Sequence, residues 1–254
     1  MPRIALIGTA STASFGFGLA SRAATVAVDY LVIGCGGNDG AGNGYGGGGG
    51  GKCLPVAKTL STTTTYAAVL GAGGSHTNTT FDGNTAAYGG DGAPGGSSSN
   101  YGGNGGPSGS GLGGGGGDQW GWDESTWSQA GGGGAGDQSS GGSGSVNPDN
   151  GMPQGGNGGN GYYWSYTGLF YGGGGGGWWL TIYAGDHNGA SGAGQENYGG
   201  GSSLGDAKSG AVIVTYVNQS QLWTGGTVTS TGSGASTRWF HTITSNTSLV
   251  PKYS

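Results

Sequence analysis

The chain has 254 residues, of which 70 are glycine and only 7% are charged, and its formal net charge is −5. Long helices are excluded because each interior glycine costs about 1 kcal/mol relative to alanine, and 8 Trp and 13 Tyr are too many aromatics for a solvating, disordered chain. No Lys or Arg occurs from Thr59 to Ala207, which excludes a nucleic-acid-binding surface over that span. No stretch approaches 18 consecutive apolar residues, so we expect no membrane span.

The N-terminus has a short apolar run that breaks at Gly8, followed by Ala-rich sequence. A cleaved secretory signal is one interpretation of such a pattern. The early break favours the other interpretation, an uncleaved arm. We expect residues 1–27 to form an N-terminal arm that docks on a neighbouring subunit.

Runs of β-branched and aromatic residues predict strands. The clearest run is Ala-Val-Ile-Val-Thr-Tyr-Val at 211–217, and no segment has a convincing 3.6-residue apolar period. The fold class is therefore all-β, and we expect a small sandwich or sheet. The predicted strands are 25–33, 54–60, 62–70, 211–217, 226–230 and 237–244.

Two cysteines, Cys35 and Cys53, bracket a glycine-rich loop. A disulfide between them would stabilise the fold by about 3 kcal/mol, but we favour two small buried thiols. A metal site would need more soft ligands nearby, so we expect neither a metal nor a cofactor. Hard oxygen ligands for a stray Ca²⁺ exist at Asp118, Asp123 and Glu124, or at Asp137, Asp149 and Asn150, although solvated acids are the interpretation that we favour.

The glycine-rich zone at about 89–210 contains local Gly-Gly-X repeats, as in Gly-Gly-Asn-Gly-Gly-Asn-Gly at 155–161. An extended polyproline-II helix has three residues per turn, so this repeat places both glycines on packing faces and X on one edge. We therefore predict polyglycine-II-like segments and long glycine-rich loops. Glycine loses the most conformational entropy on folding, and we expect a partner chain or larger assembly to hold it.

The order of the pieces resembles the glycine-rich domain of bacteriophage tail and fibre proteins. The pieces that carry the resemblance are Val28-Asp-Tyr-Leu-Val-Ile-Gly-Cys-Gly-Gly, Thr62-Thr-Thr-Thr-Tyr-Ala-Ala-Val-Leu-Gly-Ala-Gly-Gly, Thr80-Phe-Asp-Gly, the long Gly runs and Ser209-Gly-Ala-Val-Ile-Val-Thr-Tyr. They define a glycine-rich β domain at 28–217. Residues 225–229 and 238–245 look like the segment that usually precedes such a domain, and here they lie in a C-terminal β segment, 218–254.

The resemblance implies a virion appendage, such as a tail fibre, tail-tip or head-fibre protein on the particle surface. It also implies a homotrimer that contacts other virion proteins and a bacterial surface glycan or protein receptor. One alternative is a purely structural decoration or fibre-joining protein of the virion. A second is a polysaccharide depolymerase.

Two aromatic clusters interrupt the glycine, and aromatic faces suit binding by surface contact and sugar stacking. The alternative for the Trp178–Tyr183 group is packing in the core or along a trimer axis. The candidate receptor- or glycan-binding residues are Trp120, Trp122, Asp123, Glu124 and Trp127 in the first cluster, and Tyr162, Tyr163, Trp164, Tyr166, Trp178 and Trp179 in the second.

A catalytic site is not expected. Asp123 and Glu124 are adjacent, and neighbouring residues of an extended segment point to opposite sides, so they do not form a glycosidase pair. His76, His187 and His241 are isolated from any nucleophile with supporting context. We therefore predict that the protein is not an enzyme.

Overall fold

The computed structural model of the chain describes residues 24–41, 45–95, 103–120, 128–146, 153–180, 187–188, 192, 194, 196–203 and 205–252. The regular structure of these residues is β, in several antiparallel sheets, so the all-β prediction is confirmed. Their helical residues form a 3-10 turn at Gly234–Ser236. Over this part of the chain, no helix has the length and apolar character needed to cross a membrane.

One five-stranded sheet contains most of the predicted strands. Its order is β16 (Thr227–Thr231), β17 (Arg238–Ile243), β14 (Ala211–Val217), β1 (Thr25–Ile33) and β2 (Cys53–Ser61), with every pair antiparallel. The strands predicted at 25–33 and 211–217 have the observed bounds, and the other three predicted strands differ by one residue at each end. We call this sheet the five-stranded sheet A.

A second sheet has the order β15 (Trp223–Thr224), β18 (Thr247–Pro251), β3 (Tyr66–Val69), β4 (Thr79–Phe81) and β5 (Asn84–Ala86). The strand predicted at 62–70 begins late because Thr62 turns the chain and bonds to the carbonyl of Ala24. Sequence analysis missed the hairpin of β4 and β5. Its signal was the Asp-Gly pair at 82–83, where both residues have positive φ, as a two-residue hairpin turn requires.

The two sheets pack face to face, with their shared core between them, to form a sandwich. Alternate residues of each strand point inward because successive side chains of a strand lie on opposite faces. On β1 these are Val28, Tyr30 and Val32, all nearly inaccessible to solvent. Phe81 faces them from β4, with its ring 5.1 Å from that of Tyr30.

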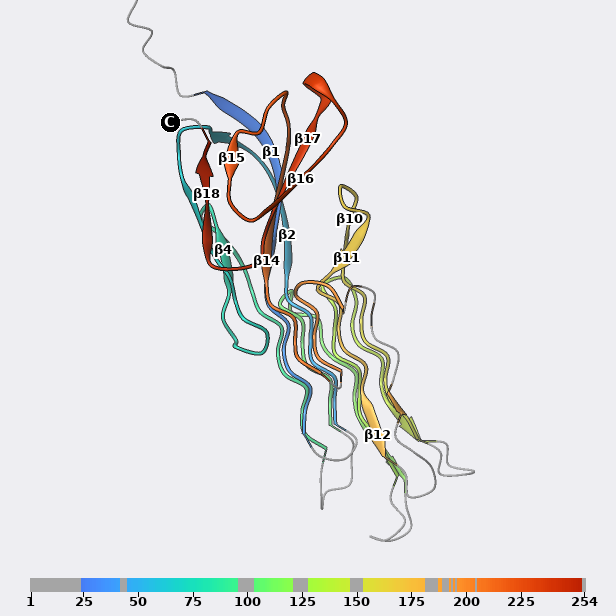
Figure 1. The fold of residues 1–254 in the computed structure, drawn as a ribbon. Coiled ribbons are helices and arrows are strands. Elements are labelled where there is room, and N and C mark those ends of the chain that lie inside the picture. The colour runs from blue at the N-terminus through green and yellow to red at the C-terminus, as the bar shows by residue number, and fades with distance from the viewer. Residues whose placement is uncertain are drawn as a thin grey trace, which may run out of the picture.

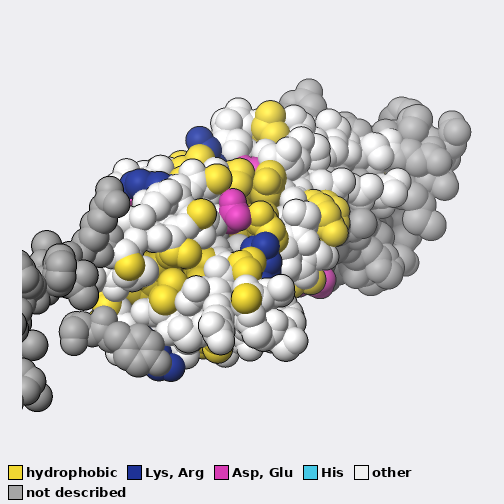
Figure 2. Space-filling model, turned by 90° about the horizontal axis from the view of Figure 1, so that it is seen from above, with side chains coloured by type: hydrophobic (Ala, Val, Ile, Leu, Met, Phe, Trp, Pro, Cys, Tyr) yellow, Lys and Arg dark blue, Asp and Glu magenta, His cyan; other side chains and the backbone are white. Residues whose placement is uncertain are grey.

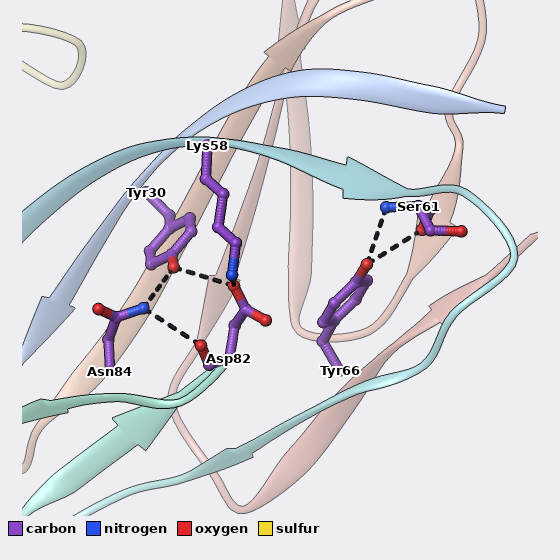
Figure 3. A network of polar contacts seen from close by, with 6 residues as sticks. All are labelled: Tyr30, Lys58, Ser61, Tyr66, Asp82 and Asn84. Atoms are coloured by element: carbon purple, nitrogen blue, oxygen red, sulfur yellow. Dashed lines mark hydrogen bonds and ion pairs between the residues drawn. The ribbon is translucent and has the colours of Figure 1, made fainter. Parts of the chain in front are cut away.

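A polar network joins the two sheets at one edge (Figure 3). Asp82, in the β4–β5 turn, accepts from the Lys58 ammonium at 2.6 Å and from the Tyr30 hydroxyl at 3.2 Å. The Asn84 side chain donates to the same Tyr30 oxygen at 2.7 Å. Burial, together with the charge of Asp82, raises the pKa of Tyr30. The network therefore satisfies the polar end of an otherwise buried ring.

The rest of the described chain is a bundle of extended glycine-rich segments that run side by side away from the sandwich (Figure 1). Strands β1, β2 and β5 continue directly into it. We call this region the glycine bundle. Its segments are 34–41, 45–52, 87–95, 103–117, 131–144, 155–160, 172–177 and 199–203.

Segment 46–51 shows how the glycine bundle is held together. Its consecutive N–H groups donate in turn to three neighbouring segments, over N···O distances of 2.7–3.0 Å. The first and fourth residues donate to 90–93, the second and fifth to 132–135, and the third and sixth to 199–202. A repeat of three residues is the period of a polyproline-II-type helix.

The close approach of these segments requires glycine. A methyl group on Gly47 would overlap with the carbonyl of Gly175, and one on Gly48 with the carbonyl of Gly37. All six glycines of 46–51 face a backbone carbonyl of a neighbouring segment in this way. Segment 131–136 repeats the pattern, since its N–H groups donate in rotation to three other neighbours. Around these segments the interior of the bundle is therefore built mostly from backbone.

These hydrogen bonds lie within one chain, and the partner chain or larger assembly that we expected to hold the glycine stays a prediction. The trimer itself stays a prediction.

Cys35 and Cys53 are free and buried, as we favoured. Strands β16, β17 and β18 of the C-terminal segment complete the two sheets of the sandwich. Most of the predicted N-terminal arm, residues 1–23, lies outside the described residues.

Candidate functional site

Strand β12 (Trp178–Leu180) marks the end of the glycine bundle that lies far from the sandwich (Figure 1). A small sheet there has the order β13 (His187–Asn188), β12 (Trp178–Leu180), β7 (Ser128–Ala130) and β6 (Asp118–Trp120), beside the pair β8 (Ser145–Val146) and β9 (Pro153–Gln154). Trp120 and Trp179 belong to these strands, but the structure describes only their backbone. Trp122, Asp123, Glu124 and Trp127 lie outside the described residues.

Trp178 is half-buried at the same end. Its ring stacks on that of Tyr45, with the centroids 5.7 Å apart and the planes at 4°. The Trp178 N–H also donates to the Tyr45 carbonyl at 2.9 Å. This contact covers one face of the Trp178 ring, and packing of the Trp178–Tyr183 group in the core or along a trimer axis stays a prediction.

Residues 162–171 of the second cluster form a hairpin of β10 (Tyr162–Trp164) and β11 (Leu169–Tyr171), which packs on the outer face of sheet A. Trp164 and Tyr171 are buried against Leu31 and Ile213 of that sheet. Tyr162 packs on the edge of the same cluster. Trp164 is 4% exposed, so its ring contributes packing and has little surface for a ligand.

The other face of the hairpin presents an exposed aromatic pair. Tyr163 and Phe170 are directly opposite each other in the register. Their rings are 5.1 Å apart, and 50% of Tyr163 and 38% of Phe170 are accessible to solvent. Strand alternation explains why these two rings point outward while Trp164 and Tyr171 point inward.

Tyr166, at the turn of the hairpin, joins it to sheet A. Its hydroxyl donates to the Asp29 carboxylate at 2.7 Å, and this hydrogen bond raises the pKa of Tyr166. The Arg238 guanidinium lies over the Tyr166 ring, 4.6 Å from its centroid. The edge of the Trp164 indole meets the ring at 5.4 Å. Tyr166 thus lies between a carboxylate and a cation.

Open pockets flank this turn on both sides. One, of about 300 Å³, lies between the hairpin and strands β1 and β2 and includes Asp29 and Tyr166. The other, of about 410 Å³, we call the Arg238 cleft. It is lined by Ser165, Tyr166, Thr167, Thr229, Thr231, Arg238 and Phe240.

Sequence analysis selected Tyr163 and Tyr166 but missed Phe170, Asp29 and Arg238. Phe170 could have been found, because it lies in the aromatic run and two strands joined by a turn would place it opposite Tyr163. No sequence pattern around Arg238 indicates that it belongs to a site. It joins the site only because the hairpin folds back on the outer face of sheet A.

The charges of the described residues are unevenly placed along the molecule. Lys52, Lys58, Lys208, Arg238 and Lys252 all lie in the sandwich or beside it. The surface seen from the sandwich end shows isolated charged side chains among uncharged ones (Figure 2). Among the described residues, no three His, Cys, Asp or Glu side chains are close enough to hold a metal ion.

No protein-family model matches the chain, and comparisons with the curated proteins and with the solved structures find no match either.

Proposed function

We propose that the protein is a bacteriophage virion appendage that attaches the particle to a glycan on the bacterial surface. The observation that carries this proposal is the exposed aromatic surface of the hairpin, formed by Tyr163, Tyr166 and Phe170. Exposed aromatic clusters on a rigid support are typical of binding surfaces. A purely structural joining protein would bury such rings against another chain.

The glycine bundle supplies the rigid support. We propose that its segments are polyglycine-II-like helices, as the three-residue hydrogen-bond period supports. Backbone hydrogen bonds in three directions brace each interior segment against bending. The sequence resemblance to glycine-rich phage proteins supports the placement on a virion, and we propose a homotrimer there, bound to other virion proteins.

The test is binding of the labelled, purified full chain to intact bacteria from a panel of strains. Two variants separate the candidate surfaces: a Tyr163→Ala/Phe170→Ala double variant on the hairpin, and a Trp120→Ala/Trp122→Ala/Trp127→Ala triple variant in the first cluster. Tyr88→Ala is the matched control, since Tyr88 is also exposed but its ring packs at a tilt against His76, away from both clusters.

We expect the parent and Tyr88→Ala to bind at least one strain equally, and the hairpin double variant to lose most of this binding. Loss in the triple variant alone would move the site to the first cluster and keep the attachment function. Absence of binding to every strain by a folded parent would contradict attachment and favour the structural alternative. Release of reducing ends from host polysaccharide would favour the depolymerase.

A further inference from the structure

We infer that the Arg238 cleft binds an acidic saccharide, with the anionic group of the sugar on the Arg238 guanidinium. The inference deepens the attachment proposal by naming its ligand class, and it rests on that proposal for the biological source of the ligand. The carboxylate of a uronic acid and the phosphate of a teichoic-acid-type polymer offer the same recognition chemistry.

Arg238 has the environment of an anion-binding residue. The register places it opposite Thr231 on β16 and Val217 on β14, toward the outer face of sheet A. It is half-buried, one nitrogen donates to the Thr215 hydroxyl at 3.4 Å, and one face lies on Tyr166. Among the described residues, no carboxylate pairs with Arg238 within salt-bridge distance.

The nearest acid is already engaged elsewhere. Asp29 accepts a hydrogen bond from the Tyr166 hydroxyl at 2.7 Å, and the Arg238 guanidinium lies over the ring of the same tyrosine. Arg238 therefore keeps N–H donors for a ligand, and a guanidinium presents such donors as a planar fork that matches carboxylate or phosphate oxygens.

The rest of the cleft matches a sugar ring. Four hydroxyl side chains line it, and each can donate and accept. They are Ser165, Thr167, Thr229 and Thr231. Phe240 lies opposite Thr229 on the same face as Arg238 and supplies an apolar ring surface. A volume of about 410 Å³ is sufficient for a monosaccharide unit with its neighbours extending into solvent.

The cleft is open to solvent, and Thr229 and Thr231 of strand β16, which line it, are exposed. This shape suits one residue of a polymer that enters and leaves the site. No Lys or Arg lies between Thr59 and Ala207, so the glycine-rich zone offers an anionic polymer no cation.

The test is isothermal titration of the full chain with three probes at low salt: trigalacturonate, a glycerol-phosphate trimer and neutral maltotriose. Arg238→Gln removes the positive charge. Arg238→Lys keeps the charge but lacks the planar, forked N–H donors of the guanidinium. Lys252→Gln is the matched control, because it removes one positive charge from an exposed position away from the cleft. Circular dichroism and thermal unfolding establish that each variant is folded.

We expect at least one acidic trimer to bind and maltotriose to bind at least tenfold more weakly. Arg238→Gln should weaken binding of that trimer by about tenfold to a hundredfold, as for lost charge-assisted hydrogen bonds, and Lys252→Gln by less than about twofold. Arg238→Lys should retain part of the affinity. Tighter binding of trigalacturonate would identify the anionic group of the ligand as a carboxylate, and tighter binding of the glycerol-phosphate trimer would identify it as a phosphate.

Equal losses in Arg238→Gln and Lys252→Gln, or no binding of either acidic trimer, would overturn the inference. The two proposals fail separately. If bacteria bind the parent and Arg238→Gln equally well, the cleft is not the attachment site although attachment stands. If the acidic trimer binds through Arg238 but no strain binds the chain, the site stands and attachment fails.

Discussion

The sandwich and the glycine bundle exclude water from their interiors in opposite ways. The sandwich excludes water with large side chains, and Trp223, Tyr30, Tyr216 and Phe81 fill its core. The glycine bundle excludes water by having no side chains, so that backbones approach each other directly. Stability in the sandwich comes from buried apolar area, whereas order in the bundle comes from hydrogen bonds in three directions. Substitutions that remove side-chain atoms should destabilise the sandwich, and substitutions that add atoms should destabilise the glycine bundle.

The largest expected effect is in the sandwich. Phe81→Ala would leave a cavity between the two sheets, where Phe81 is 1% exposed and meets Tyr30. We expect the free energy of unfolding to fall by about 3–5 kcal/mol, measured by chemical denaturation. Val69→Ala on β3, where the side chain is 52% exposed, is the control and should change stability by less than about 0.5 kcal/mol.

The glycine bundle should show the reverse sensitivity. Gly48→Ala adds one methyl group that overlaps with the Gly37 carbonyl, and backbone cannot move aside as a flexible side chain can. We expect a loss of about 3 kcal/mol or more. In Gly113→Ala the new methyl group meets nothing within 4 Å, so stability should be unchanged or rise by about 0.4–1 kcal/mol. Equal effects of the two substitutions would contradict a packed bundle.

A pH-dependent effect should arise in the sandwich. His241 is fully buried, with Nδ1 at 3.0 Å from the Gly225 carbonyl and Nε2 at 3.2 Å from the Tyr216 hydroxyl. A carbonyl only accepts, so Nδ1 carries the proton and Nε2 accepts from Tyr216. Burial lowers the pKa of His241 below its ordinary 6.5, so the folded protein keeps this ring neutral.

As the pH falls below about 6.5, the unfolded chain therefore binds a proton that the folded chain does not. Stability should decrease with falling pH by at most about 1.4 kcal/mol per pH unit, until the pH reaches the lowered pKa. Denaturation of the parent and of His241→Gln between pH 7 and pH 5 measures this dependence. An unchanged slope in the variant would mean that another group causes it.

The smallest effects should come from the polar network at the sandwich edge. Tyr30→Phe removes the hydroxyl that links Asp82 and Asn84, and we expect a loss of about 1 kcal/mol. Lys58→Met breaks an ion pair whose ammonium partner is largely exposed, and the loss should be at most about 1 kcal/mol. A larger loss in Lys58→Met than in Tyr30→Phe, by thermal unfolding, would reverse this ranking.

The same contrast explains what the sequence could predict. β1 and β14 were predictable because they are rich in β-branched and aromatic residues and are bounded by glycine at 34 and 210. Short strands such as β15 exist because a neighbouring strand pairs with them, and two residues carry no periodic signal. In the glycine bundle the period of three is visible in the repeats, but identical glycines cannot indicate which segment lies beside which. The contact between Arg238 and Tyr166 could not be predicted either, because the two residues are far apart in the sequence and come together only in the folded structure.

Amide hydrogen exchange of the monomeric chain, resolved to segment 46–51, tests the central claim most directly. Every N–H of this segment donates within the chain, so we predict protection comparable to that of the core strand β14. Exchange of 46–51 at the rate of a free peptide, while β14 stays protected, would show that the glycine segments do not hold one another and would contradict the account.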